Sequence, residues 1–241
     1  SIGCEADLPT KAQILEKMRL ANSYFMKKWP DPTVDIVTNK TRPSNIWTRA
    51  TYYEGLMALY KIDPDSAYYN YAVQWGESHN WDTAYRRPGN RNADDQCCGQ
   101  TYLELYQIDP RPERIERIKA TIDQMVEDGS NDAWWWIDAL QMGMPVFAKL
   151  GVIFAEDRYF EKMYQIYHYT KTQHGDHGLY NPEDHLWWRD QDFDPPTTTP
   201  NGKHVYWSRG NGWVLAAFAR VLEIMPEDAP HREEYVTTFK E

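Results

Sequence analysis

Residues 52–64 read YYEGLMALYKIDP and residues 96–110 read QCCGQTYLELYQIDP, two segments that share a glycine, an apolar stripe and an Ile-Asp-Pro ending. The stretch LQMGMPVFAKLG at 140–151 repeats much of this pattern. The leading glycines of the three segments are spaced 44 residues apart, at Gly55, Gly99 and Gly143. Small or apolar residues at i, i+3, i+4 and i+7 predict helices, each closed by a Pro or a Gly. A fixed spacing of this size indicates a repeat protein.

A fourth segment, RGNGWVLAAFARVLEIMP at 209–226, continues the series after an insertion, so that Gly212 lies 69 residues beyond Gly143. Longer and more highly charged amphipathic stretches separate the segments, at 11–29, 65–80, 111–127 and 156–173. A polar outer helix followed by an apolar inner helix, repeated along the chain, specifies stacked helical hairpins that curve into a solenoid or close into a ring. The fold class is therefore all-α, with a plain helical bundle as the alternative.

The chain is expected to contain one domain at 11–241, preceded by an N-terminal tail at 1–10. Residues 174–207 form the insertion, which is rich in Gly, Pro and Thr. Its alternating segments, HLWWRD at 185–190 and KHVYW at 203–207, flank a Pro-Pro and an Asn-Gly pair. This pattern predicts a β-hairpin or a long loop. Long loops on a rigid scaffold commonly bind ligands.

The composition bounds the function. The chain has 241 residues, among them 11 Trp, 17 Tyr and 7 Phe, and a net charge of −10. That much aromatic surface excludes a disordered chain, and no apolar run approaches the roughly 20 residues of a membrane span. The acidic balance argues against nucleic acid as a partner. Rings with polar tips favour a wet aromatic groove in which sugars stack.

Three cysteines, Cys4, Cys97 and Cys98, do not form a plausible disulfide framework, and we interpret them as small core residues. The first residues, SIGCEAD, resemble what remains of a bacterial lipoprotein signal after cleavage. This resemblance predicts a periplasmic or cell-envelope protein with a lipid on Cys4. A cytoplasmic location is the alternative.

The charges on the Gly-led helices gather where each helix begins. Asp94 and Asp95 precede the second of these helices, Asp138 precedes the third, and Arg209 precedes the fourth. In a ring of hairpins these positions face one mouth. Carboxylates in an aromatic groove with an arginine opposite are suited to general acid–base chemistry on sugars. Alternatively, the acids cap their helices and Arg209 forms a structural salt bridge.

The aromatic surroundings of these charges refine the prediction. Trp134, Trp135 and Trp136 lead directly into Asp138, and desolvation by such neighbours would raise its pKa. Trp207 and Trp213 flank Arg209, which can hold a carboxylate through two hydrogen bonds.

The histidines of the insertion have two interpretations. The residues that suggest a metal site are His174, Asp176, His177, Asp184, His185 and His204. Their spacing does not match that of a helical zinc motif, and we expect no metal. We interpret His185, which lies between Asp184 and a Trp pair, as a hydrogen-bonding wall of the groove.

Four stretches carry a resemblance to a known family: WTRATYYEGLMALYKIDP, NADDQCCGQTYLELY, WWWIDALQMGMPVFAKLG and WSRGNGWVLAAFARVLEIMP. The chain resembles the bacterial unsaturated glucuronyl and rhamnogalacturonyl hydrolases of glycoside hydrolase families 105 and 88, and more closely family 105. The resemblance implies a barrel of six α/α hairpins without a metal or another cofactor. It also implies substrates that polysaccharide lyases release from pectin- or rhamnogalacturonan-like polymers, with a Δ4,5-unsaturated uronic acid at the non-reducing end.

The resemblance further implies roles for individual residues. Asp138 protonates C4 of the double bond and activates the water that adds at C5, after which the hemiketal rearranges and expels the next sugar. Asp95 aligns with the second acid of the family, beside Asp94 in the substrate site. The other expected substrate contacts are His185, Trp207, Arg209, Trp213 and Trp136. A histidine that family members often carry before the catalytic acid is absent from residues 127–132.

The repeat count predicts four complete hairpins, with residues 228–241 starting a fifth. Six hairpins of about 44 residues would need a longer chain, so we expect a partial barrel whose open edge self-association could cover. Two other functions are consistent with the residues. One is a non-catalytic carbohydrate-binding half-barrel, and the other is an ordinary inverting glycosidase or a lyase on the same architecture.

Overall fold

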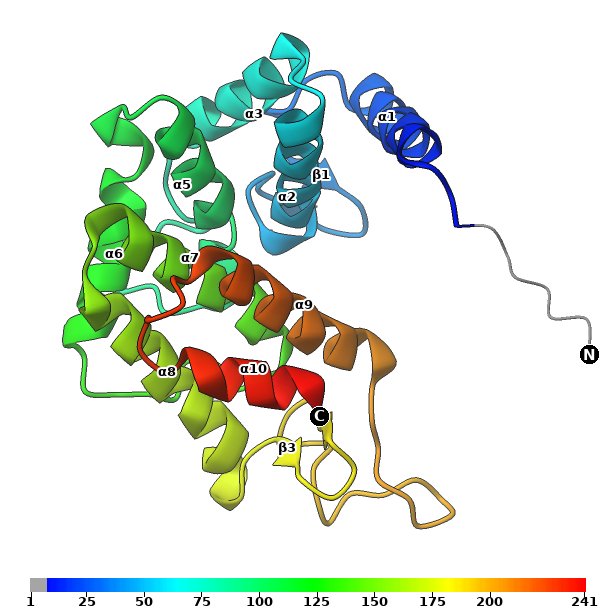
Figure 1. Ribbon diagram of the computed structural model, residues 1–241, viewed down its shortest axis with the longest axis vertical. Coiled ribbons are helices and arrows are strands. Elements are labelled where there is room, and N and C mark those ends of the chain that lie inside the picture. The colour runs from blue at the N-terminus through cyan, green and yellow to red at the C-terminus, as the bar shows by residue number, and fades with distance from the viewer. Residues whose placement is uncertain (1–7) are drawn as a thin grey trace, which may run out of the picture.

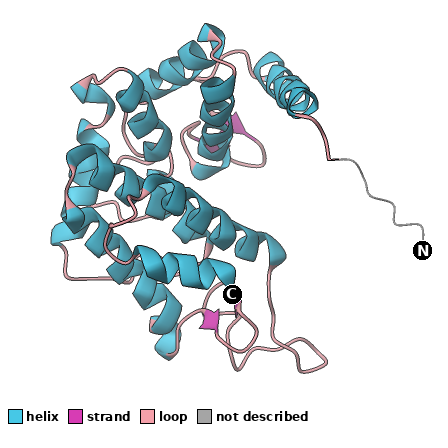
Figure 2. Ribbon diagram, in the orientation of Figure 1, coloured by secondary structure: helices cyan, strands magenta, loops and turns pink. Residues whose placement is uncertain are grey.

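The computed structural model describes residues 8–241, which fold mainly as helices joined by loops (Figures 1 and 2). The α-helices are α1 (Lys11–Lys28), α2 (Trp47–Ile62), α3 (Ser66–Ser78), α4 (Ala93–Gln96), α5 (Gly99–Ile108), α6 (Glu116–Glu127), α7 (Asp138–Phe154), α8 (Asp157–Thr172), α9 (Ser208–Ile224) and α10 (Arg232–Lys240). Two 3-10 turns span Pro112–Arg114 and His174–Asp176, and the short strands are β1 (Ile36–Val37), β2 (Thr41–Arg42), β3 (Tyr180–Asn181) and β4 (Leu186–Trp187).

The helices alternate between outer and inner positions as the repeat predicts. The charged stretches form α1, α3, α6 and α8, and the Gly-led segments form the inner helices α2, α4 with α5, α7 and α9. Successive inner helices pack on one another, α2 on α5, α5 on α7 and α7 on α9. Figure 1 shows the hairpins following one another around a curve, with α10 packed against α9 as the start of a fifth outer helix. The all-α hairpin prediction is confirmed.

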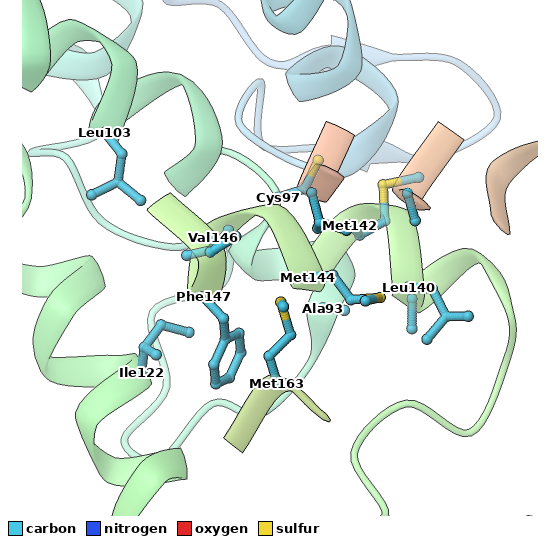
Figure 3. Close-up of a cluster of buried hydrophobic side chains, with 14 of the residues drawn as sticks. Ala93, Cys97, Leu103, Ile122, Leu140, Met142, Met144, Val146, Phe147 and Met163 are labelled. Atoms are coloured by element: carbon cyan, nitrogen blue, oxygen red, sulfur yellow. The ribbon is translucent and has the colours of Figure 1, made fainter. Parts of the chain in front are cut away.

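Helix α7 lies at the centre of the core. Every residue from Asp138 to Gly151 is buried, because α7 is covered by α4, α5, α8 and α9. A helix buried on all sides needs an almost continuously apolar sequence, which the segment DALQMGMPVFAKLG supplies. Figure 3 shows Leu140, Met144 and Phe147 of α7 among side chains from the neighbouring helices.

Close packing explains why residue 143, in the third repeat, is a glycine. A Cβ at Gly143 would lie 2.8 Å from Nε1 of Trp134, whose ring is fully buried. The bare backbone of α7 therefore lets the Trp134 ring pack against it. At Gly55, the equivalent position of α2, a Cβ would meet no atom within 4 Å. The same sequence signature thus has different packing consequences in different repeats.

The insertion differs in part from its prediction. A hairpin forms, but β4 pairs with β3 through Tyr180↔Trp187 and Asn181↔Leu186, and residues 203–207 form no strand. The nearer partner closes a much shorter loop and loses less chain entropy. The Asn-Gly turn is present, since Thr199 N–H donates to the Lys203 carbonyl at 2.8 Å. The segment 203–207 lies against the hairpin through stacked rings of Trp188 and Tyr206, with centroids 6.2 Å apart.

The remaining sequence predictions have mixed outcomes. Cys97 and Cys98 are free and fully buried, as expected for core residues. Cys4 and most of the tail at 1–10 lie outside the described residues, so the lipid anchor and the envelope location stay predictions. Among the helices of residues 8–241, none has the length and hydropathy needed to cross a bilayer. Self-association at the open edge also stays a prediction.

Candidate active site

Asp138 is the first residue of α7, and the preceding Ile137 occupies the cap position. The Ile137 N–H donates to the Arg189 carbonyl at 3.0 Å, which ties the start of α7 to the insertion. The Asp138 side chain is 9% exposed, and its Oδ1 has no hydrogen-bond partner among the described residues. Burial raises the pKa of Asp138, while Arg189 and Arg209 oppose this shift. A buried carboxyl with a free oxygen and a raised pKa can act as a general acid.

The three tryptophans before Asp138 take different positions. Trp134 packs beneath α7 at Gly143, whereas Trp135 is exposed and Trp136 is half-buried, with their ring centroids 4.6 Å apart. Among these three tryptophans, Trp136 is the one that the sequence predicts as a substrate contact. Its ring is partly accessible to solvent.

Asp94 and Asp95 are the second and third residues of α4, and neither caps it. Asn92 is the cap, and its Oδ1 accepts from the Asp94 N–H at 2.8 Å and the Asp95 N–H at 3.3 Å. Burial raises the pKa of Asp94 to about 7, and the charge of Asp138 is the next largest cause. The charge of Asp138 thus acts on Asp94 across the contact between α4 and α7.

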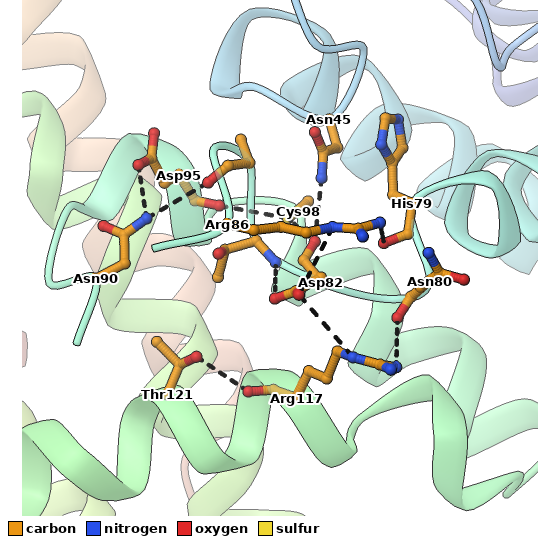
Figure 4. Close-up of polar contacts among 12 residues, drawn as sticks. Asn45, His79, Asn80, Asp82, Arg86, Asn90, Asp95, Cys98, Arg117 and Thr121 are labelled. Carbon is orange, nitrogen blue, oxygen red and sulfur yellow. Dashed lines mark hydrogen bonds and ion pairs between the residues drawn. The ribbon is translucent and has the colours of Figure 1, made fainter. Parts of the chain in front are cut away.

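Asp95 belongs to a different environment. It is 3% exposed, and its Oδ2 accepts from Asn90 Nδ2 at 2.7 Å (Figure 4). The guanidinium of Arg87 lies 3.7 Å from the same oxygen. These partners tie Asp95 to the loop before α4. The geometry favours Asp94 over the sequence-predicted Asp95 as the acid opposite Asp138.

A polar network fixes the loop that carries these acids. The Asp82 carbonyl accepts from Asn45 Nδ2 and from the Tyr102 hydroxyl, both at 3.0 Å. Its carboxylate lies 3.8 Å from Arg86 and 3.9 Å from Arg117 of α6 (Figure 4). These contacts connect the loop at 79–92 to α5, α6 and the segment before α2, so the loop presents α4 and its Asp94 from a fixed backbone.

Arg209 lies at the start of α9 and lines a pocket of about 390 Å³. Its guanidinium stands 4.6 Å from the centre of the Trp207 ring, and it makes no ion pair with a carboxylate of the described residues. The other lining residues are Arg189, Phe193, Val205, Tyr206 and Trp207. The structural salt bridge considered for Arg209 is therefore not formed, and its charge remains available to an anion.

Arg189 was missed by the sequence reasoning. Its Nε lies 2.8 Å from Asp190, its guanidinium covers the Phe193 ring at 4.7 Å, and its charge lowers the pKa of Asp138. The sequence feature that could have identified it is its position directly after Trp187 and Trp188, since Arg209 likewise follows a tryptophan closely.

Trp213 and His185 lie outside the pocket lining. The Trp213 ring meets Trp47 of α2 edge-on at 6.4 Å, and its buried Nε1 has no partner among the described residues. His185, at the tip of the β3–β4 hairpin, is exposed and 3.9 Å from Glu241. The described residues give His185 no contact with Asp138 or Arg209. Its role as a wall of the groove stays a prediction.

The histidines of the insertion are arranged as structural partners. His177 pairs with Asp194 at 3.2 Å, and the rings of His177 and His204 lie edge-on to Trp188. Within residues 8–241, the structure contains no group of three or more His, Cys, Asp or Glu side chains placed to hold a metal ion.

The family model described as Glycosyl Hydrolase Family 88 matches residues 17–241. The chain belongs to this family. A relative from Formosa agariphila named unsaturated 3S-rhamnoglycuronyl hydrolase is 31% identical over 215 residues, which cover 81% of this chain and 55% of the relative. The family 88 chain therefore spans little more than half the length of that relative.

Solved structures agree with the family assignment. A family 88 glycosyl hydrolase from Bacteroides vulgatus superposes with a TM-score of 0.86 at 30% identity, covering 96% of this chain and 66% of that one. A protein described as a polysaccharide lyase gives a TM-score of 0.84 at 29% identity, covering 95% of this chain and 64% of that one. A family 105 hydrolase from C. acetobutylicum shares the fold, with a TM-score of 0.68 at 15% identity and coverage of 96% and 64%. The (α/α)-barrel relationship predicted from the sequence is confirmed.

Proposed function

We propose that this chain hydrolyses oligosaccharides that carry a Δ4,5-unsaturated uronic acid at the non-reducing end. The observation that carries the proposal is the buried Asp138 carboxyl with an unpartnered Oδ1 at the start of α7, which packs against α4, the helix that carries Asp94. The name of the Formosa agariphila relative supports this substrate class and favours rhamnose as the neighbouring sugar.

The proposed reaction begins with protonation of the enol ether. Asp138 gives its proton to C4 of the double bond, and the resulting oxocarbenium ion at C5 is attacked by water. The Asp138 carboxylate accepts the proton of that water, which regenerates the acid and leaves a hemiketal. Opening of the hemiketal breaks the C5–O5 bond and leaves C1 as a hemiacetal. Collapse of this hemiacetal breaks the bond to the next sugar, so a net addition of one water releases two products.

The pocket at the start of α9 supplies the binding contacts. Arg209 lines this pocket without an ion-pair partner among the described residues, whereas Arg189 lines it while paired with Asp190. A guanidinium can hold a carboxylate through two parallel hydrogen bonds. Trp207 and Tyr206 offer ring faces for the sugar. The charge of Asp138 raises the pKa of Asp94, and two neighbouring carboxylates do not both ionise readily, so the pair retains one proton near neutral pH.

The test uses an unsaturated disaccharide and follows its ultraviolet absorbance, which disappears when the double bond is hydrated. Wild-type protein is expected to remove the absorbance, and Asp138→Asn to lose at least about a thousandfold in kcat. Asp157→Asn is the matched control, because Asp157 is the first residue of α8 and is exposed. Retention of activity in Asp138→Asn would sink the proposal.

A lyase is the second candidate, because the neighbour described as a polysaccharide lyase is 29% identical. A lyase would create absorbance from a saturated uronic acid polymer instead of removing it. A non-catalytic binding module would bind the disaccharide in calorimetry and leave its absorbance unchanged.

A further inference from the structure

A buried carboxylate outside the lining of the substrate pocket joins the inner helices. Glu54 of α2 is 4% exposed. Its Oε2 accepts from Gln141 Nε2 of α7 at 2.9 Å and lies 3.1 Å from Nη2 of Arg220 on α9. The thiol of Cys97, which follows α4, donates to Oε1 at 3.6 Å. One side chain thus connects α2 to each of the three helices that carry the candidate site.

These partners lie close in sequence to the reacting groups. Gln141 follows Asp138 by one helical turn on α7, and Cys97 follows Asp94 by three residues. Gln100 of α5 adds a second connection, since its Nε2 donates to the carbonyls of Gln141 at 2.8 Å and Met142 at 3.1 Å. The polar contacts therefore hold the turn of α7 below Asp138 against the segment that carries Asp94.

The ionic group is costly at this position. Burying an ion pair costs the hydration free energy of both charged groups, whereas burying apolar side chains of equal volume does not. A protein with apolar side chains in place of a buried ion pair is therefore commonly as stable. Burial also raises the pKa of Glu54 to about 7, which reflects the same penalty. The benefit of such a group is its fixed geometry, because a carboxylate with several donors accepts few arrangements of the surrounding helices.

We propose that Glu54 is a positioning residue that, through Gln141, Cys97 and Arg220, sets the separation of Asp94 and Asp138 and their alignment with Arg209. This inference rests on the proposed hydrolase function for its kinetic consequence. Misplacement of a catalytic group by about 1 Å can lower a rate a hundredfold without weakening substrate binding to the same degree.

The first test compares kinetics on the unsaturated disaccharide. Glu54→Gln and Gln141→Met are expected to lower kcat by about ten- to a hundredfold while KM changes by less than about threefold. Gln141→Met breaks the connection without changing any charge. The double variant Glu54→Gln/Gln141→Met is expected to lose little more than either single variant, because both act through one contact.

The matched control is the ion pair between Glu104 of α5 and Lys149 of α7, at 3.2 Å. It lines the same cavity of about 540 Å³ as Glu54 and Arg220, but it lies about three turns along α7 from Asp138. Glu104→Gln is expected to change kcat by less than about threefold at a similar loss of thermal stability. Equal loss of kcat in Glu104→Gln would mean that Glu54 acts only through general stability, and would overturn the proposal.

The second test needs no substrate. The carboxyl carbons of Asp94 and Asp138 are titrated by NMR in the wild type and in Gln141→Met. We expect the titration midpoints of both residues to shift in the variant, because their separation changes. Unchanged midpoints together with unchanged kcat would overturn the proposal. Shifted midpoints in a protein that consumes no unsaturated disaccharide would retain the positioning role and reject the hydrolase function.

Discussion

The charge of Asp138 on α7 acts on Asp94 of the neighbouring helix α4, and after burial it is the largest cause that raises the pKa of Asp94 to about 7. The two acids come from separate repeats, 44 residues apart in the chain. The hairpin repeat brings them together, because equivalent positions of successive inner helices meet at one end of the curve.

This pair predicts the pH dependence of the reaction. The proton donor must be protonated, and the pair keeps its last proton until about pH 7, where Asp94 titrates, so kcat/KM should fall as pH rises through about 7. The charged groups nearest the pair are Asp95 at Asp94 and, at Asp138, Arg189, Arg209 and Asp190. Asp94→Asn removes one member and is expected to abolish the limb near pH 7, whereas Asp157→Asn should leave it in place. If kcat/KM of Asp94→Asn still fell through about pH 7 as in the wild type, Asp94 would not be the group that controls this pH dependence.

The same pair predicts a dependence of stability on pH. The pKa of Asp94 is raised in the folded state, so folding favours its protonated form, and the associated stability is lost as pH rises from about 4 to about 7. Asp94→Asn should therefore raise Tm at pH 8 by about 2–4 °C or more and have little effect at pH 4. Thermal melts followed by circular dichroism measure both values.

Asp31 provides a control of opposite sign. Hydrogen bonds from the side chain and backbone of Thr33 lower the pKa of Asp31, so its contribution is present above about pH 4 and lost in acid. Asp31→Asn should lower Tm slightly at pH 8. A melting temperature for Asp94→Asn that also falls at pH 8 would show that the carboxyl is not destabilising.

The sequence predicts the helices and the position of Asp138 well, because both follow from a pattern repeated several times. It does not decide between Asp94 and Asp95. Adjacent residues on a helix point about 100° apart, and the phase of the four-residue helix α4 is set by the Asn92 cap and by Asn90, which binds Asp95. Arg189 escapes prediction for a related reason, since it lies in an insertion without periodicity and reaches the site through tertiary packing.

Arg209 is expected to recognise the carboxylate of the substrate. It stacks on Trp207 and makes no ion pair with the described residues, so its planar group is free to form two hydrogen bonds. Arg209→Lys keeps the charge but loses this geometry, and should raise KM about tenfold or more. Arg111→Lys, at an exposed pair with Asp109, is the control and should leave kinetics unchanged. Equal KM values for wild type and Arg209→Lys would place the carboxylate elsewhere.

The repeat glycines predict two opposite stability changes. A Cβ at Gly143 would lie 2.8 Å from the buried Trp134 ring, so Gly143→Ala forces the ring or α7 to move and should cost about 1–3 kcal/mol. Gly55 has the matched position in α2 with no atom within 4 Å, so Gly55→Ala should gain up to about 1 kcal/mol from helix propensity. Urea unfolding measures both.

Because Trp134 leads into Asp138, Gly143→Ala should also lower kcat, whereas Gly55→Ala should not. A neutral Gly143→Ala would show that the close contact between Trp134 and α7 relaxes without cost.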